Sequence, residues 1–509
     1  MQLADATRVS GELTLERGTG SIEWLVDNAV AYRALLAAIA RAERSIWITQ
    51  LAFDADCRVY DETCVSSADM GAPLLLDALA DASRRGVAVR IVLNETLLLD
   101  TATPLRKAIA ASGATNIAVR GLHHFPQLLH AKMCIVDEDE AIVAGSPFVN
   151  GYWDHSGHAP SDARRPTREL GGRPLHDLSM RVTGATVDAL GQVFAELWND
   201  ATIGAPDAAR VEPRGCDSGD DACLRLTRTV AHGVLARHPD GLMEIVSGVE
   251  RAIAKARRFI YIEHQYLSSE RVITALAQAL AREPALEVVI VLNQNPDVTA
   301  YRVWQRTRLR SAGLLDHPRV GIFALWSARP SMHDGCEWDV SQIFVHSKVL
   351  IVDDAWLTAG SANLDGVSLH SYGADFTSRI GERVFRDVRN YDVNLELTVH
   401  DDDSLLALRT LRDVLWREHL GPDVDVERVS LALWRAHAHE CVDALRHEPE
   451  FDLGGAPHTT MVLPYSTEAT PGAQLRALGI KVDERIDLLF DPGWLEVHCS
   501  PNWIRNMFA

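Results

Sequence analysis

Two segments of the sequence carry the same reactive side chains at the same spacing. Both follow the pattern His-x-Lys-x4-Asp and both end in Gly-Ser, in LLHAKMCIVDEDEAIVAGS at residues 128–146 and in IFVHSKVLIVDDAWLTAGS at residues 343–361. The repeated residues are His130, Lys132 and Asp137 in the first segment and His346, Lys348 and Asp353 in the second. Because the chain has only five lysines, two such matches at equivalent positions are not expected by chance. The repeat therefore indicates a shared chemical role.

The spacing indicates which side chains act together. Residues i and i+2 of a strand point to the same face, so each histidine projects with its lysine. Each aspartate has the opposite parity, and we expect Asp137 and Asp353 to anchor the turn after the strand, although a bend could return them to the site. Imidazole and ammonium are thus the chemical pair.

Two such pairs that converge on one point would form a pocket suited to a phosphodiester. The lysines would neutralise the non-bridging oxygens, and donors from Ser146, Ser361 and Asn363 would complete the phosphate cradle. One imidazole would attack phosphorus, while the other would protonate the leaving alcohol and then deprotonate the water or alcohol that resolves the intermediate. This chemistry needs no cofactor.

The segments that precede the two motifs repeat as well. A helical pattern at residues 31–45 runs into an apolar strand at 46–53, and the same order returns at 242–259 and 260–267. In both copies a second helix, a second strand that ends in VLN and a third strand follow before the motif. Each copy closes with a helix rich in Leu and Trp. Strands that alternate with helices predict an α/β fold with mixed sheets covered on both faces.

We therefore expect two duplicated α/β units related by a pseudo-twofold axis, with a single active site between them. The expected divisions are an N-terminal half at 1–202, a polar connector at 203–240, a C-terminal half at 241–424 and a small appendage of turns and short strands at 425–509. Both halves of the site lie in one chain, so we expect a monomer.

The paired motif resembles the signature of the phospholipase D superfamily, and the likeness extends from AERSIWITQLAFD to LWREHLG. Flanking segments such as YWDHSGHAP, IYIEHQYL and GSANLD are most similar to lipid-acting members. The resemblance implies a two-step, metal-independent transfer through a phosphohistidine, with His130 as nucleophile and His346 as general acid and base. It also implies an acidic residue downstream of each motif that orients the histidine of the other half. By position these are Asp177 in PLHDLSMRV and Glu396 in VNLELTV, although either could be an ordinary surface charge.

The sequence departs from the family pattern in several places. Asn150 in GSPFVN lies one residue beyond the usual asparagine, and GSANLDGVS lacks the Arg-Ser that often follows GSANL. Inserts are expected around 54–72, 326–342 and 369–391. They bear on which head group or acceptor is used and not on the reaction at phosphorus. His264 is expected either to line the pocket or to end its strand.

The charge and the apolar content of the chain limit which binding partners and which location we expect. The chain has 509 residues, and 50 basic against 70 acidic residues give a net charge of −20, which disfavours a surface for nucleic acid. No transmembrane segment or signal peptide is recognisable, so we expect a cytoplasmic or peripheral membrane protein, with signal-independent export also compatible. Loop histidines at 123, 124, 155 and 158 beside Asp154 have no fixed metal spacing, and no metal is expected.

Three functions remain for comparison. The leading hypothesis is a phospholipase D that acts on phospholipid at a membrane surface and passes the phosphatidyl group to water or a small alcohol. The second is a metal-independent nuclease of the same superfamily, and the third is a lipid-binding protein without catalysis. Two intact motifs argue against the third.

Overall fold

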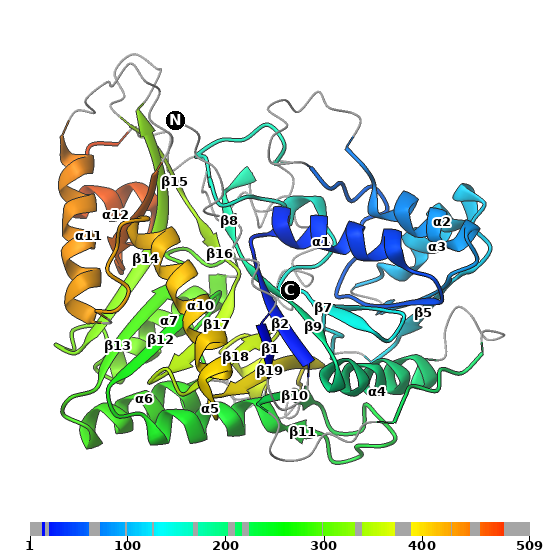
Figure 1. Cartoon of the computed structure of the whole chain (residues 1–509). Helices are drawn as coiled ribbons and strands as arrows, with labels where there is room; N and C mark the ends of the chain where they lie inside the picture. The colour runs from blue at the N-terminus through cyan, green and yellow to red at the C-terminus, as the bar shows by residue number, and fades with distance from the viewer. Residues whose placement is uncertain are drawn as a thin grey trace.

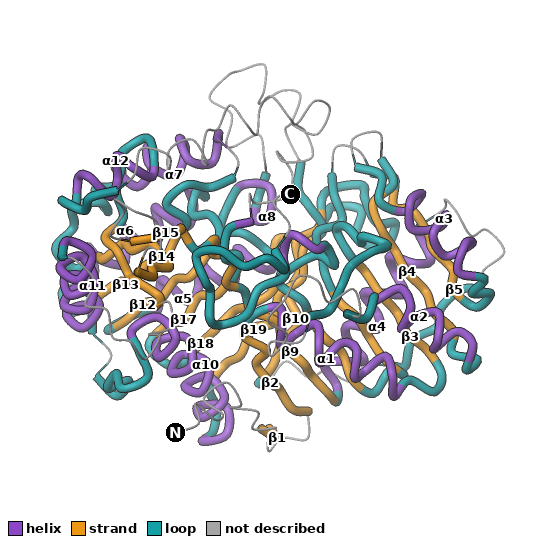
Figure 2. Tube along the Cα trace, turned by 90° about the horizontal axis from the view of Figure 1, so that it is seen from above, coloured by secondary structure: helices purple, strands orange, loops and turns teal. Residues whose placement is uncertain are grey.

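The structure is a computed structural model of the whole chain. It describes residues 13–15, 20–60, 72–96, 99–124, 127–165, 172–201, 209–215, 223–297, 299–330, 338–371, 388–428, 430–447 and 459–482. The two halves lie side by side, with the first half in blue to cyan and the second in green to orange (Figure 1). Figure 2 shows the same arrangement from above. Parts of all three expected inserts, at 61–71, 331–337 and 372–387, lie outside the described residues.

The first half is built on a mixed sheet with the strand order β1-β2-β9-β7-β6-β3-β4-β5. The strands are β1 (Leu13–Leu15), β2 (Gly20–Val26), β3 (Ser45–Thr49), β4 (Ala88–Asn94), β5 (Ile117–Leu122), β6 (Met133–Val136), β7 (Glu140–Val143) and β9 (Leu178–Thr183). β3, β4 and β5 are parallel, whereas β6 pairs antiparallel with both β3 and β7. The parallel strands are joined by helices, as the sequence pattern predicts.

The second half repeats this order as β11-β10-β19-β18-β17-β12-β13-β14-β15, with β20 also paired to β14. The strands are β10 (Leu224–Val230), β11 (Leu242–Met243), β12 (Phe259–His264), β13 (Glu287–Leu292), β14 (Val320–Pro330), β15 (Trp338–Gln342), β17 (Lys348–Val352), β18 (Trp356–Gly360), β19 (Asp392–Thr398) and β20 (Thr459–Pro464). The run from β10 to β14 matches the run from β2 to β5, strand for strand. The duplicated α/β fold is confirmed.

Helices cover both faces of each sheet. Those in the first half are α1 (Asn28–Arg41), α2 (Leu75–Arg84), α3 (Ala102–Ser112) and α4 (Ala185–Asp200). Those in the second half are α5 (Glu244–Lys255), α6 (Glu270–Arg282), α7 (Thr299–Ser311), α8 (Gly366–Leu369), α10 (Asp402–Leu420), α11 (Leu431–Arg446) and α12 (Pro471–Ala477). Along β3, Ile46 and Ile48 pack into the core under α1 to α3, while Trp47 faces the cluster that contains α4. This alternation follows from the two-residue period of a strand.

One apolar cluster passes through both halves. It combines α4 and one face of the first sheet with α10, α11 and one face of the second sheet. Trp198, Trp416 and Trp434 are fully buried in it. Because this core is continuous, the two halves form a single packed body, which fixes the position of one motif relative to the other.

Two expected divisions of the chain are wrong. The region 203–240 contains β10, which lies between β11 and β19 in the second sheet, so the second half begins before residue 241. The region 425–509 contributes α11, β20 and α12, and β20 extends the second sheet beside β14. Their apolar residues complete a core over β14, which is why this segment folds as part of the second half. Among the described residues no helix has the length and apolar character needed to cross a membrane.

Candidate active site

Each motif is held in place by backbone of the opposite half. The N–H groups of His130 and Ala131 donate to the carbonyl of Tyr391 at 2.9 and 2.7 Å, just before β19. The N–H of His346 donates to the carbonyl of His176 at 2.7 Å. This second contact continues a short parallel pairing of β8 (Leu175–His176) with β16 (Phe344–Val345). Two equivalent sets of backbone hydrogen bonds between the halves therefore place the two histidines at their interface.

Each motif histidine is paired with a carboxylate of the other half. His130 Nδ1 lies 2.7 Å from Asp392 Oδ1, and His346 Nδ1 lies 2.9 Å from Asp177 Oδ2. All four side chains are buried. A carboxylate at Nδ1 fixes the ring orientation and favours a proton on that nitrogen, which leaves Nε2 as the reactive atom.

The predicted partner Asp177 is therefore placed beside His346, but Glu396 is not placed beside His130. Asp392 occupies that position, four residues before Glu396 on β19, a separation of about 13 Å along a strand. Glu396 packs closely against Gly248 of α5, where burial raises the pKa of its carboxyl group. Asp392 replaces Glu396 as the partner because it holds the position equivalent to Asp177: Asp177 directly precedes β9, and Asp392 begins the equivalent strand β19.

The Gly-Ser pair after each motif supports these carboxylates. Ser146 Oγ donates to Asp177 Oδ2, and Ser361 Oγ donates to Asp392 Oδ1 at 2.7 Å. The sequence predicts that both hydroxyls bind phosphate, but a hydroxyl has one proton, and here each proton is given to a carboxylate. A Cβ atom on Gly145 would lie 2.2 Å from Asp177 Oδ1, so the glycine leaves the space that Asp177 needs.

The two lysines are buried in the same region. Lys132 Nζ donates to the carbonyl of His130 at 2.9 Å, and Lys348 Nζ donates to that of His346. Each side chain has 1% of its surface exposed. Burial and the charge of Lys348 lower the pKa of Lys132 to about 7, while burial lowers the pKa of Lys348 to about 8. Two ammonium groups in one buried space attract an anion.

The histidines are held neutral near pH 7. Burial and the charge of Lys132 lower the pKa of His130 to about 4. Burial and the charge of Lys348 lower the pKa of His346 to about 3. Although burial alone would raise it, His346 and Lys348 hold the pKa of Asp177 at about 2. A neutral imidazole has a free lone pair on one nitrogen, as a nucleophile requires.

The motif aspartates lie at the far ends of their strands. Asp137 accepts from the N–H groups of Glu43, Arg44 and Ser45 at 2.7–2.8 Å. Asp353 accepts equivalent bonds, also at 2.7–2.8 Å, from the N–H groups of residues 257, 258 and 259. Both have positive φ angles, of 55° and 54°, in the turns of hairpins β6–β7 and β17–β18. They fasten each hairpin to the start of β3 or β12 and do not reach the histidines.

Several further polar groups are buried near the motifs. His264 lies opposite Lys348 in the register of β12 and β17, and neither of its ring nitrogens has a hydrogen-bond partner among the described residues. Gln50, at the equivalent place after β3, has an amide without a partner in the same described part of the chain. Asn363 is buried, and its Oδ1 has no partner among these residues either, whereas Asn150 bonds to Asp56 and Arg58. Buried polar atoms usually have a hydrogen-bond partner, so these three side chains have polar atoms available for one.

The loop histidines do not gather into one site. His123 Nδ1 lies 2.5 Å from the carbonyl of Glu95, and His155 contacts Arg164. His158 is instead buried against Asp154 of its own loop and against Asp27 and Glu418 from distant segments. Local spacing does not reveal the two distant partners.

Comparison with known proteins agrees with this architecture. A family model described as cardiolipin synthase, PLD-like domain, matches residues 35–156 and 249–377, which contain one motif each. Phospholipase D alpha 4 of Arabidopsis thaliana is 21% identical over 341 residues, covering 54% of this chain and 42% of that protein. Phospholipase D zeta 1 of the same plant is 28% identical over 288 residues, covering 45% and 24%.

The matched region thus spans less than half the length of these two relatives. Among solved structures, the phosphatidylserine synthase of Haemophilus influenzae Rd KW20 superposes with a TM-score of 0.51 at 13% identity, covering 78% of this chain and 86% of that one. This likeness concerns the fold. The repeated family match and the phospholipase D relatives show that the chain belongs to the phospholipase D superfamily.

Proposed function

We propose that the chain is a phosphodiesterase of phospholipase D type. It hydrolyses glycerophospholipid to phosphatidic acid and free head group, or it transfers the phosphatidyl group to an alcohol. The observation that carries this proposal is the pair of buried His–Asp contacts, one from each half, in the same region as two buried lysines. A phosphodiester needs this combination of nucleophile, acid and positive charge.

In the first step His130 Nε2 attacks phosphorus and the bond from phosphorus to the head-group oxygen breaks. Asp392 at Nδ1 stabilises the positive charge that develops on the ring. The leaving oxygen takes a proton from His346 Nε2. Lys132 and Lys348 stabilise the charge on the non-bridging oxygens.

In the second step His346 accepts a proton from water or an alcohol, whose oxygen attacks phosphorus. The bond from phosphorus to His130 Nε2 then breaks, which restores the imidazole. The bound anion raises the low pKa values of both histidines, so one proton can reside on His346 when substrate is present. Water gives phosphatidic acid, and an alcohol gives the exchanged phospholipid.

The lipid reading is favoured by charge and by the relatives. The net charge of −20 opposes long contacts with a polyanion, whereas a single phosphodiester needs only the local charge of the two lysines. The curated relatives named above are phospholipases D. A nuclease with the same catalytic residues is the second candidate.

The test uses mixed vesicles of phosphatidylcholine, phosphatidylethanolamine and phosphatidylglycerol with ethanol present. Products are identified by mass spectrometry, and His346→Ala is the control. We expect phosphatidic acid together with phosphatidylethanol, both lost in the control. Phosphatidylethanol identifies transfer through an intermediate that ethanol can intercept.

Absence of any lipid product from vesicles and from detergent micelles would contradict the lipid reading. Oligonucleotide and plasmid substrates are then tested with the same pair of proteins. Cleavage of nucleic acid that is lost in His346→Ala would assign the chemistry to the nuclease reading.

A further inference from the structure

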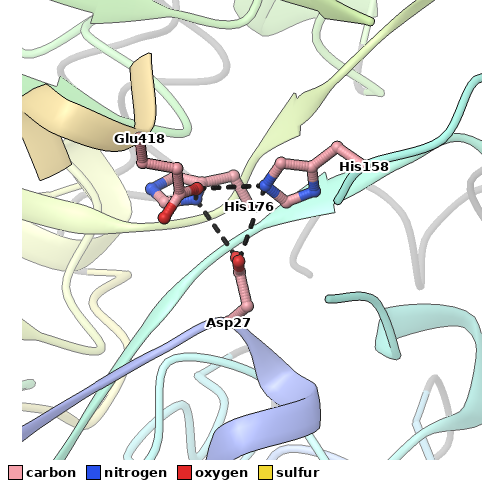
Figure 3. A group of neighbouring side chains, drawn as sticks. All are labelled: Asp27, His158, His176 and Glu418. Atoms are coloured by element: carbon pink, nitrogen blue, oxygen red, sulfur yellow. Dashed lines mark hydrogen bonds and ion pairs between the residues drawn. The ribbon is translucent and has the colours of Figure 1, made fainter. Parts of the chain in front are cut away.

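Four ionisable side chains from distant segments meet behind the second motif histidine. They are Asp27 before α1, His158 in the loop after the 3-10 turn Asn150–Tyr152, His176 at the end of β8 and Glu418 in α10. Each offers one ligand atom, and these atoms all lie within 4.8 Å of one another. Figure 3 shows the two imidazoles and two carboxylates pointing toward a common centre. The group is separate from the His–Asp pairs of the active site.

The distances among these atoms match the edges of a coordination tetrahedron. His176 Nδ1 lies 3.1 Å from Asp27 Oδ1 and 2.8 Å from Glu418 Oε1. His158 Nε2 lies 3.1 Å from Glu418 Oε1 and 3.6 Å from Asp27 Oδ2. Ligands bound about 2.0 Å from a tetrahedral ion are separated by about 3.3 Å. These four contacts, which use both oxygens of Asp27, have about the length expected between side chains that share one ion.

The opposite nitrogen of each imidazole is held by a further carboxylate. His158 Nδ1 lies 3.0 Å from Asp154 Oδ2, and His176 Nε2 lies 2.9 Å from Glu263 Oε1. Histidines that bind metals nearly always make such a contact, because it fixes the ring and raises the basicity of the ligating nitrogen. Both imidazoles here have this second carboxylate, and both are buried.

Asp27 gives independent support. Its side chain has 1% of its surface exposed, and Oδ2 has no hydrogen-bond partner among the described residues although it faces the centre of the group. Asp27 and His158 also have positive φ angles of 63° and 44°. Non-glycine residues adopt this conformation at a cost, and such strain concentrates where the position of a side chain matters.

We propose that Asp27, His158, His176 and Glu418 bind one divalent transition-metal ion, with Zn²⁺ as the first candidate. Two imidazoles and two carboxylates would fill a tetrahedral coordination shell, which leaves no position for substrate. The ion joins the start of α1, the loop that contains His158 and the end of β8 to α10. The carbonyl of His176 accepts a hydrogen bond from the N–H of His346. An ion bound to His176 would therefore help to fix the position of the second motif histidine.

A neighbouring trio, His176, Glu263 and His419, is a weaker candidate. Both oxygens of Glu263 already accept from hydroxyls, from Ser347 and, at 2.5 Å, from Tyr261. A carboxylate whose two oxygens each already accept a hydroxyl proton has fewer lone pairs left for a metal ion.

The test measures metal content in the full chain, expressed with added zinc and dialysed. Elemental mass spectrometry should find about one equivalent of zinc per chain. His158→Gln should reduce it at least about tenfold, and the matched variant His419→Gln, a buried histidine next to Glu418 in sequence, should retain it. Co²⁺ exchanged into the wild type should give the strong visible absorption of four-coordinate cobalt.

Two results would overturn the proposal. One is a wild-type chain with less than about 0.1 equivalent of any transition metal after zinc loading. The other is metal that remains in His158→Gln but is lost from His419→Gln, which would place the ion in the neighbouring trio. If His158→Gln does not fold, X-ray absorption at the zinc edge of the wild type replaces it. A zinc ligand shell that lacks imidazole nitrogen or carboxylate oxygen would exclude this site. None of these readouts depends on phospholipase activity.

Discussion

Replacement of Asp392 by asparagine tests the assignment of the His130 partner. The two side chains meet at 2.7 Å and are 1% and 0% exposed, so solvent does not screen their interaction. Asparagine keeps the size of the side chain but removes its charge. A charge that develops on the imidazole about 4 Å from a carboxylate is stabilised by about 4 kcal/mol at an effective dielectric constant near 20. The amide dipole retains part of this, which leaves a loss of about 3–4 kcal/mol in the transition state.

A loss of that size lowers kcat/KM by about 10²–10³-fold. The assay is the initial rate of phosphatidic acid formation from phosphatidylcholine vesicles. Glu396→Gln is the matched control, since it makes the same chemical change four residues along β19, and it should stay within about twofold of the wild type. Thermal unfolding of both variants verifies that they are folded.

The reasoning would be refuted if folded Asp392→Asn kept more than about a third of the wild-type kcat/KM. It would also be refuted if Glu396→Gln lost as much activity as Asp392→Asn. The second result would mean that the loss of activity in Asp392→Asn does not depend on its contact with His130.

Three further predictions follow from the site. Each lysine is cationic below its pKa and neutral above it, and the pKa values of Lys132 and Lys348 are about 7 and about 8. The kcat/KM for an anionic phosphodiester should therefore fall as the pH rises through about 7 to 8, and a flat profile to about pH 9.5 would contradict this. Asp353→Ala removes the acceptor of three backbone N–H groups and should lower the free energy of unfolding in urea by about 2–4 kcal/mol. The folded fraction should keep its kcat, and a large loss of kcat would return Asp353 to the catalytic group. Gly145→Ala should displace Asp177 and lower kcat/KM about 10²-fold, whereas unchanged kinetics would show that Asp177 does not need this space.

The sequence predicts the repeated part of the fold well because the two copies can be compared with each other. The apolar runs at 46–53 and 260–267 contain all but the first residue of β3 and of β12. The helical patterns before them contain most of α1 and all of α5. The sequence does not predict β10, because its strand, LRLTRTV, lies next to a polar stretch and has an arginine on each face. Its place between β11 and β19 depends on pairing with distant residues, which no local pattern encodes.

The motif histidines and lysines are predictable because they repeat, whereas the identity of their carboxylate partners depends on the register of the strands. HDLSM at 176–180 and YDVNL at 391–395 align as equivalent strand starts, and this alignment selects Asp392. The choice of Glu396 came from its position after a long insert, where spacing from the motif carries no information. The four residues of the proposed metal site come from distant parts of the sequence, near residue 27, at 158–176 and near residue 418, so only the folded chain reveals the group.

The most direct measurement is the site of covalent attachment during turnover. Protein is mixed with phosphatidylcholine vesicles, quenched in alkali because phosphohistidine is labile to acid, digested and analysed by mass spectrometry. The account predicts a phosphatidyl adduct on the peptide that contains His130. An adduct on the peptide that contains His346, or turnover without any adduct on either histidine, would contradict the account.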